Sequence, residues 1–254
     1  QMQQAGLRPN TAAFTSLIDA CGKALELERA FRLMAYMTQI GVPPNAATYT
    51  SLIDACGKAQ QLDNAFSLFN HMHSIGVVPS AATYTTLVSV CARCGEIDRA
   101  FSVLEQMGTT NATPDAITYT ALIAACVRNQ QLNRAFDVLS QMKQLDLRLN
   151  AVTYSALIDA CCKVSDLARA ETALHVMRSE GHVPDAATWN KLLVTCCEHQ
   201  VHDRLFAHLE GMRALSLVPN APTVNYLLAN YTGDRAYLEE GLRSFQEPAK
   251  HVPT

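Results

Sequence analysis

The sequence predicts an all-α protein, a solenoid of helix-turn-helix repeats, and three features of its 254 residues indicate this class. Six segments similar to "NAATYTSLIDACGKAQQLDNAF" follow one another without insertions at a period of 35 residues. Apolar residues show helical spacing twice within each period. Cysteine, leucine and methionine each recur at the same period. The recurring positions are Cys21, Cys56, Cys91, Cys126, Cys161, Cys196, Leu17, Leu52, Leu87, Leu122, Leu157, Leu192, Met37, Met72, Met107, Met142, Met177 and Met212.

The repeat that begins at residue 46 illustrates the expected elements in order. Apolar residues from Tyr49 to Cys56 predict a first helix, and those from Leu62 to Met72 predict a second. A residue suited to N-capping precedes each first helix. These residues are Asn45, Ser80, Asp115, Asn150, Asp185 and Asn220. Proline precedes the cap in five repeats, and Leu149 replaces it in the other. One hairpin cannot cover its own apolar faces, so neighbouring repeats must stack around a continuous core and form a concave surface.

The repeat pattern divides the chain. We expect the tail of a preceding repeat at 1–10, and therefore a piece of a longer protein. Six full repeats follow at 11–45, 46–80, 81–115, 116–150, 151–185 and 186–220. Residues 221–254 read as a degenerate or capping repeat and a tail, since "APTVNYLLANYT" lacks the cysteine.

Composition excludes several classes of function. With 20 Lys and Arg against 23 Asp and Glu, the net charge of −3 gives no bulk attraction to nucleic acid. No apolar run is long enough to span a membrane. The sequence lacks HExxH, a Gly-rich phosphate loop and a nucleophile elbow, so we expect no enzyme and no cofactor. The cysteine ladder is expected to be a reduced core without disulfide or zinc, with Cys162 and Cys197 as the more exposed thiols.

One face of each first helix lies away from the core residues and carries the fifth, ninth and thirteenth residues of the repeat. Five of the six thirteenth residues are basic, which predicts a local cationic row that Glu198 interrupts. The basic residues are Lys23, Lys58, Arg93, Arg128 and Lys163. Carboxylates such as Asp63 and Asp98 are expected instead at the start of the second helices, where they complement the helix dipole.

The period, the "TYxxLI" opening and the Gly-x-x-Pro-[Asn/Asp/Ser] close resemble the pentatricopeptide repeat family over essentially the whole chain. The resemblance implies a right-handed α-solenoid that binds single-stranded RNA, and basic thirteenth residues suit contacts to its phosphates. It also implies a mitochondrial or chloroplast protein acting in RNA stabilisation, processing or translation. In this family the fifth and last residues of a repeat together select one base. The pairs are Thr15 with Asn45, Thr50 with Ser80, Thr85 with Asp115, Thr120 with Asn150, Ser155 with Asp185 and Asn190 with Asn220.

The family's preferences give the target 5′-A-N-G-A-G-Y-3′, in which the second letter is A or unresolved. The family also packs bases against the second residues of its repeats. These are Ala12, Ala47, Ala82, Ile117, Val152 and Ala187, and the small alanines predict weak packing. The alternative is a protein-binding helical scaffold, for example a component of an organellar ribosome, or a partner of other RNA-processing proteins.

Overall fold

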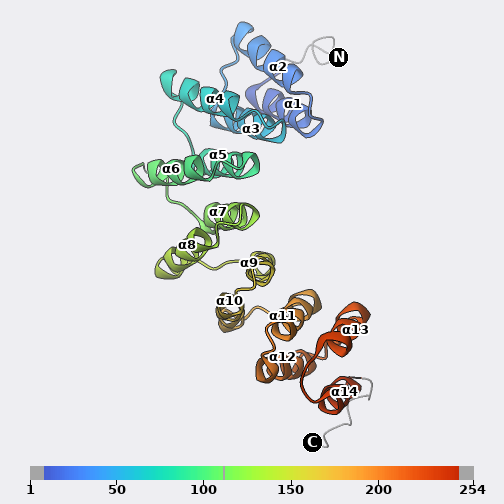
Figure 1. Ribbon diagram of the computed structural model, residues 1–254. Coiled ribbons are helices and arrows are strands. Elements are labelled where there is room, and N and C mark those ends of the chain that lie inside the picture. The colour runs from blue at the N-terminus through green and yellow to red at the C-terminus, as the bar shows by residue number, and fades with distance from the viewer. Residues whose placement is uncertain (1–8, 111, 246–254) are drawn as a thin grey trace, which may run out of the picture. The chain divides into compact units, whose positions relative to one another are not determined.

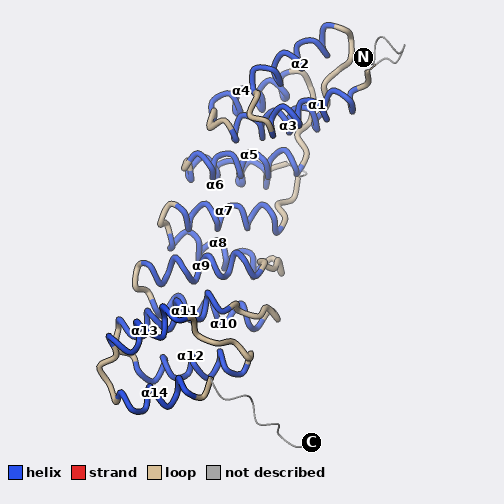
Figure 2. The backbone as a smooth tube through the Cα atoms, turned by 90° about the vertical axis from the view of Figure 1, so that its right-hand side faces the viewer, coloured by secondary structure: helices blue, strands red, loops and turns tan. Residues whose placement is uncertain are grey.

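The computed structural model describes residues 9–110 and 112–245, which contain helices and no strands (Figure 1, Figure 2). They belong to two compact bodies, Gln1–Arg148 and Leu149–Thr254. The first body contains α1 (Thr11–Lys23), α2 (Leu27–Gln39), α3 (Ala46–Lys58), α4 (Leu62–Ser74), α5 (Ala81–Cys94), α6 (Ile97–Gly108), α7 (Ala116–Arg128) and α8 (Leu132–Gln144). The second contains α9 (Ala151–Lys163), α10 (Leu167–Ser179), α11 (Ala186–Glu198), α12 (His202–Ala214), α13 (Ala221–Asn230) and α14 (Arg235–Arg243).

Each body is a stack of antiparallel helical hairpins. In the first body α1 packs on α3, α3 on α5 and α5 on α7; in the second, α9 packs on α11 and α11 on α13. The predicted all-α solenoid of helix-turn-helix repeats is therefore confirmed. Most of the predicted partial repeat at 1–10, and the last nine residues of the predicted segment 221–254, lie outside the described residues.

The predicted caps begin the first helices. Each cap residue has an extended backbone, and its side-chain oxygen accepts a hydrogen bond from the N–H three residues later. Asn10 caps α1 in the same way. A cap satisfies one of the N–H groups that an α-helix leaves unpaired at its start. The expectation that these residues are N-caps is confirmed.

A second recurring device closes the hairpins. After α1 the chain turns through Leu25, whose φ of 59° is left-handed. The N–H of Glu26 then donates to the carbonyl of Cys21 at 2.9 Å, and that of Leu25 to Gly22 at 3.3 Å. This pair of bonds is a Schellman motif, which satisfies carbonyls at a helix C-terminus. The short turn holds the second helix against the first.

The core consists of the positions that the sequence pattern predicts. The aromatic residues Phe14, Tyr49, Tyr84, Tyr119, Tyr154 and Trp189 are 0–7% exposed, and the methionine ladder is buried with them. Leu17 differs from the rest of its ladder, because it is 49% exposed whereas the others are fully buried. It belongs to the first hairpin of the described chain, so no described hairpin covers that side of it.

The cysteine ladder is buried, but the expectation of exposed thiols at Cys162 and Cys197 is wrong. Both side chains are less than 9% exposed, because they lie where one first helix meets the next. Among the nine cysteines Cys94 is the most accessible. Burial raises the pKa of the Cys56 thiol to about 11 and those of Cys161 and Cys196 to about 12. In the described part of the chain, no helix is both long and apolar enough to cross a membrane.

Stacking requires small residues where first helices approach closely. A Cβ atom added at Gly22 would lie 2.8 Å from Cβ and 3.4 Å from Cα of Ala55, on the neighbouring first helix. We expect Gly22→Ala to lower the free energy of unfolding by about 1–3 kcal/mol, since α1 and α3 would be forced apart. Gly108→Ala is the matched control: a Cβ added there, in the last turn of α6, meets nothing within 4 Å. Urea unfolding followed by circular dichroism measures both, and equal stability of the two variants would contradict the close-packing argument.

Candidate functional site

The predicted base-selecting residues are connected through buried threonines. The third residue of every repeat after the first is threonine: Thr48, Thr83, Thr118, Thr153, Thr188 and Thr223. All are at most 6% exposed. Each threonine is positioned by the cap residue three places before it, because the side-chain oxygen of the cap accepts a hydrogen bond from the threonine backbone N–H. Four of the hydroxyls are thereby held at the boundary between two stacked repeats of one body, those of Thr48, Thr83, Thr118 and Thr188.

The third repeat shows the arrangement most clearly. Thr85 and Thr118 lie on α5 and α7, and their hydroxyl oxygens are 2.7 Å apart. The Thr118 hydroxyl also donates to Oδ1 of Asp115 at 2.9 Å. The fifth and last residues of this repeat, Thr85 and Asp115, are therefore joined by one buried hydroxyl.

The same chain of contacts recurs elsewhere in both bodies. Thr48 lies 2.8 Å from the Thr15 hydroxyl and donates to Asn45 Oδ1 at 3.0 Å. Thr83 lies 2.9 Å from Thr50 and 3.0 Å from Ser80.

In the second body the Thr188 hydroxyl donates to Oδ1 of Asp185 at 2.6 Å and lies 2.9 Å from the hydroxyl of Ser155. The pair Thr120 and Asn150 has one member in each body. In the second body Asn150 Oδ1 accepts the Thr153 hydroxyl at 2.8 Å.

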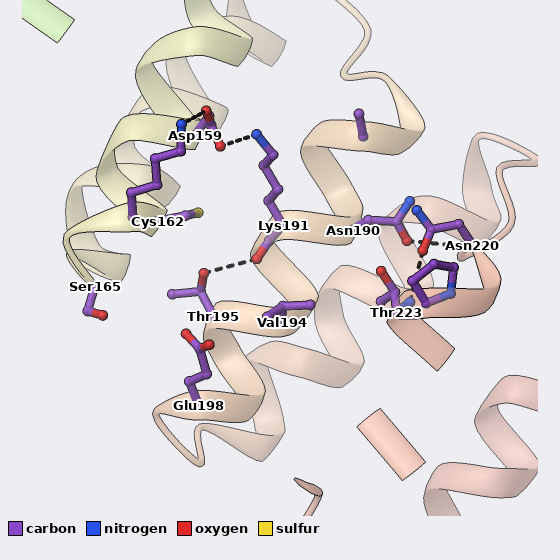
Figure 3. A pocket seen from close by; sticks show the side chains of 13 residues that line it. Asp159, Cys162, Ser165, Asn190, Lys191, Val194, Thr195, Glu198, Asn220 and Thr223 are labelled. Carbon is purple, nitrogen blue, oxygen red and sulfur yellow. Dashed lines mark hydrogen bonds and ion pairs between the residues drawn. The ribbon is translucent and has the colours of Figure 1, made fainter. Parts of the chain in front are cut away.

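The sixth repeat departs from this pattern. Asn190 is 6% exposed, and its Oδ1 accepts the backbone N–H of Asn220 at 3.2 Å. Its Nδ2 donates to the carbonyl of Ala186 at 2.7 Å. Asn190 and Asn220 thus lie side by side (Figure 3), but both polar atoms of Asn190 are bonded to main chain.

Capping fixes which atom each last residue turns outward. Oδ1 of Asn45 is held by Thr48, so the exposed side chain presents its Nδ2, a donor. Oδ1 of Asp115 is held by Thr118, so the exposed atom is a carboxylate oxygen, an acceptor. Ser80 uses its single side-chain oxygen for the cap. The three cap types therefore offer three different surfaces at equivalent positions.

The six second residues are all exposed next to the caps. The two large ones are among the most exposed apolar side chains, with Ile117 at 68% and Val152 at 80%. An apolar side chain with this exposure can cover the face of a planar ring. The alanines at the other four positions offer only a methyl group.

The cationic row is less free than the sequence suggests, because three of the six first helices carry aspartate at the ninth residue of the repeat. Asp54 pairs with Lys58 at 2.7 Å and with Arg93 of the next repeat at 2.8 Å. Burial alone would raise the pKa of Asp54, but the hydrogen bonds from Lys58 and Arg93 outweigh it and lower the pKa. Lys23 pairs with Asp19 in the same way. Carboxylates therefore lie beside the cationic row as well as in the first turns of second helices, where Asp63 and Asp98 are found as expected.

Arg128 is the exception in the first body. Its guanidinium donates to the carbonyl of Ala92 at 3.4 Å, and no carboxylate of the described chain is paired with it.

In the second body, a groove of about 560 Å³ lies along α9, α11 and the start of α13 (Figure 3). Asp159 on α9 holds Lys163 at 2.9 Å and also Lys191 of α11. Burial tends to raise the pKa of Asp159, but these two lysines lower it. Glu198 occupies the thirteenth position at one end of the groove, and Asn190 and Asn220 lie at the other. Lys191 therefore supplies a positive charge in the repeat whose thirteenth residue is acidic.

Comparison with family models covers most of the chain. Residues 1–110 match the model of the pentacotripeptide-repeat region of PRORP, residues 114–163 match the PPR repeat family, and residues 152–182 match the PPR repeat. This chain belongs to the pentatricopeptide repeat family.

Solved pentatricopeptide repeat structures match as well. The crystal structure of the pentatricopeptide repeat protein PPR10 from maize has 25% identity and a TM-score of 0.73 over 99% of this chain. PPR10 in complex with an 18-nt psaJ RNA element has 25% identity and a TM-score of 0.60 over 96% of this chain. This chain spans 36% and 40% of those two chains.

The PPR domain of Arabidopsis thaliana PRORP1 in complex with tRNA shares the fold, with 22% identity and a TM-score of 0.59. That match covers 75% of this chain and 95% of that one. Among curated proteins no match is found. The described residues contain no group of three His, Cys, Asp or Glu side chains that could hold a metal ion.

Three sets of residues in this pentatricopeptide repeat site were not predicted from the sequence. The buried threonine ladder was visible as the Thr of the "TY" pair in each repeat. Asp54 and Asp159 recur at the ninth position of their repeats, and that spacing was the available signal. Lys191 carried no periodic signal, since the other repeats have serine, threonine or alanine at its place.

Proposed function

We propose that this chain binds single-stranded RNA selectively, with one base addressed by each repeat. The observation that carries the proposal is the division of labour within each acidic or amide cap. One side-chain atom caps the helix, while the cap side chain itself is exposed. In the first and third repeats a buried threonine hydroxyl connects the cap to the fifth residue of the same repeat. An array of this kind places one donor or acceptor beside each successive base.

The outward atoms account for the proposed letters. The exposed oxygens of Asp115 and Asp185 accept, which suits the ring N–H and amino group of guanine at letters three and five. The exposed Nδ2 of Asn45 and Asn150 donates, which suits a ring nitrogen of adenine at letters one and four. Ser80 has no second polar atom, so its letter stays unselective. The sixth letter comes instead from the family's preference for asparagine at both places, because both polar atoms of Asn190 are bonded to main chain. That preference is a pyrimidine, which gives 5′-A-N-G-A-G-Y-3′.

Phosphates and base faces have their own contacts. Lys23, Lys58, Arg93, Arg128 and Lys163 line the same side of the first helices as the fifth residues and bind phosphate. Two of these basic residues are also paired with aspartates, Lys58 with Asp54 and Lys163 with Asp159. The RNA phosphates compete with these aspartates for the lysines. Ile117 and Val152 pack against bases, whereas Ala12, Ala47, Ala82 and Ala187 contribute little. Affinity is therefore concentrated where the apolar side chains are large.

We place this activity in a mitochondrion or chloroplast, in the stabilisation, processing or translation of a transcript. Occupying a segment of RNA can block a nuclease or recruit another protein without any reaction by the repeats themselves. The similarity to PPR10, solved with an RNA element, and to the PRORP1 domain, solved with tRNA, supports RNA as the ligand. The family models that match are repeat models, which supports a binding role rather than catalysis.

Binding of short oligonucleotides tests the proposal. An A-N-G-A-G-Y RNA should bind more tightly than a scrambled RNA of equal composition, measured by fluorescence anisotropy at a stated salt concentration. Equal binding of the two sequences would remove the code. Binding of neither, with stable capture of an organellar protein partner, would replace the proposal by the scaffold alternative.

Exchange of a single cap tests one letter. Asp115→Asn keeps the cap oxygen and changes the outward atom from acceptor to donor, so the third letter should move from G towards A by about 1–3 kcal/mol. Asp98→Asn is the matched control, because it removes the same charge at a different place. The Asp98 side chain lies on α6 and is 92% exposed. A change at all letters alike, or the same change in both variants, would contradict base selection by Asp115.

The cationic row should set the salt dependence of binding. Replacing Lys58, Arg93 and Arg128 by Ala should weaken binding of all sequences alike and reduce the slope of log affinity against log salt by about 2. The control replaces Arg29, Arg99 and Arg134, which carry the same charge on second helices. An unchanged slope in the first variant, or an equal reduction in the second, would show that the phosphates lie elsewhere.

A further inference from the structure

The buried threonine ladder has contacts that capping alone does not explain. In a capping box the N3 side chain bonds back to the cap residue, as Thr48 and Thr83 do. That motif is local to one helix. Four of the six threonines, Thr48, Thr83, Thr118 and Thr188, make a second contact to the fifth residue of the preceding repeat. That residue is on a different helix and 33 residues away in sequence.

Counting protons in the third repeat shows what the second contact does. The Thr118 hydroxyl has one proton, and it donates that proton to the carboxylate of Asp115. In the 2.7 Å contact with Thr118, Thr85 must therefore be the donor. The proton of Thr85 is turned into the protein, and only its lone pairs remain for a ligand. A cap that only accepts hydrogen bonds thus determines that the fifth residue presents lone pairs, and no proton, to a ligand.

The fifth repeat contains the same triad with a stronger central bond. The Thr188 hydroxyl lies 2.6 Å from the carboxylate of Asp185 and 2.9 Å from the hydroxyl of Ser155. Its single proton goes to the charged acceptor, so Ser155 must donate in the second contact, as Thr85 does in the third repeat. The hydroxyl of Thr188 is the largest cause of the lowered pKa of Asp185. Because Thr188 is 3% exposed, water cannot replace this bond without rearrangement.

We infer that Thr118 and Thr188 are positioning residues for base selection: each buried hydroxyl fixes which polar atom its cap and fifth residue present to the base. This inference rests on the proposed RNA function. It adds a third determinant to each letter, one that does not contact the ligand. A repeat with the same fifth and last residues but no hydroxyl at the third place would select its base less well.

Two valine variants test the inference and serve as controls for each other. Thr118→Val should reduce the preference for G over A at the third letter by about tenfold and leave the fifth letter unchanged. Thr188→Val should reduce the preference for G over A at the fifth letter and leave the third letter unchanged. Serine at either position keeps a hydroxyl and should restore the preference. Affinity for each single-letter RNA variant is measured by anisotropy, and circular dichroism confirms that every variant is folded.

A second readout needs no RNA. The carboxyl carbon of Asp185 is titrated by NMR in the wild type and in the two Thr188 variants. Thr188→Val should raise the pKa of Asp185 towards its ordinary value, and Thr188→Ser should keep it low. A merely structural role for Thr188 would change the melting temperature without this pattern of restoration by serine.

The outcomes distinguish a failure of this inference from a failure of the proposed RNA-binding function. Letter-specific loss, with restoration by serine and a raised pKa in Thr188→Val, supports the positioning role. A selective wild type with valine variants that keep their letters, or lose all letters equally, overturns the inference alone. A wild type without any letter preference overturns the proposed function, and the inference falls with it, whatever the titration gives.

Discussion

Within each body, the packing of a first helix on the first helix of the next repeat is the contact on which the rest of the structure depends. A single hairpin has an apolar stripe on both helices and cannot cover it alone, so the exclusion of apolar surface from water requires a neighbour. The fixed 35-residue period then makes every boundary within a body nearly the same. Residues at one place of the repeat fall into rows. The site is a consequence of these rows, because no single repeat contains it.

Close approach of the first helices makes polar contacts between repeats possible. Gly22 against Ala55 leaves no space for a larger side chain, and it brings the hydroxyls of Thr15 and Thr48 within 2.8 Å of each other. Buried hydroxyl pairs of this kind need both partners, since an unmatched buried polar atom is costly. The threonine ladder therefore fixes the register of stacked repeats as well as the side chains around it. Packing and the proposed recognition of bases therefore use the same boundary between repeats.

The sequence predicted best what depends on local chemistry. Caps such as Asn45, the helical spacing of Tyr49 and Leu52, and the buried aromatic series follow from rules that act within a few residues. The contact of Arg93 with Asp54 joins residues 39 apart in sequence, and which of several nearby carboxylates a long side chain reaches depends on the stacked geometry. The burial of Cys162 likewise depends on its neighbour α11 and could not be predicted from α9 alone. Asn190 has the residue type expected of a base-selecting position, but its amide is bonded to main chain at both ends.

Capping and the proposed base recognition are compatible because they use different atoms of one side chain. Asn, Asp and Ser cap helices about equally well, and loss of such a cap costs about 0.5–2 kcal/mol. Exchange among these residues therefore keeps the helix start, while the outward atom changes from a donor to an acceptor or is lost. Base preference can then vary from repeat to repeat with little effect on stability. The buried threonine is the fixed part of this arrangement, because its N–H and hydroxyl hold whichever cap oxygen is present. In the proposed mode of binding, repeats with the same fold can therefore prefer different bases.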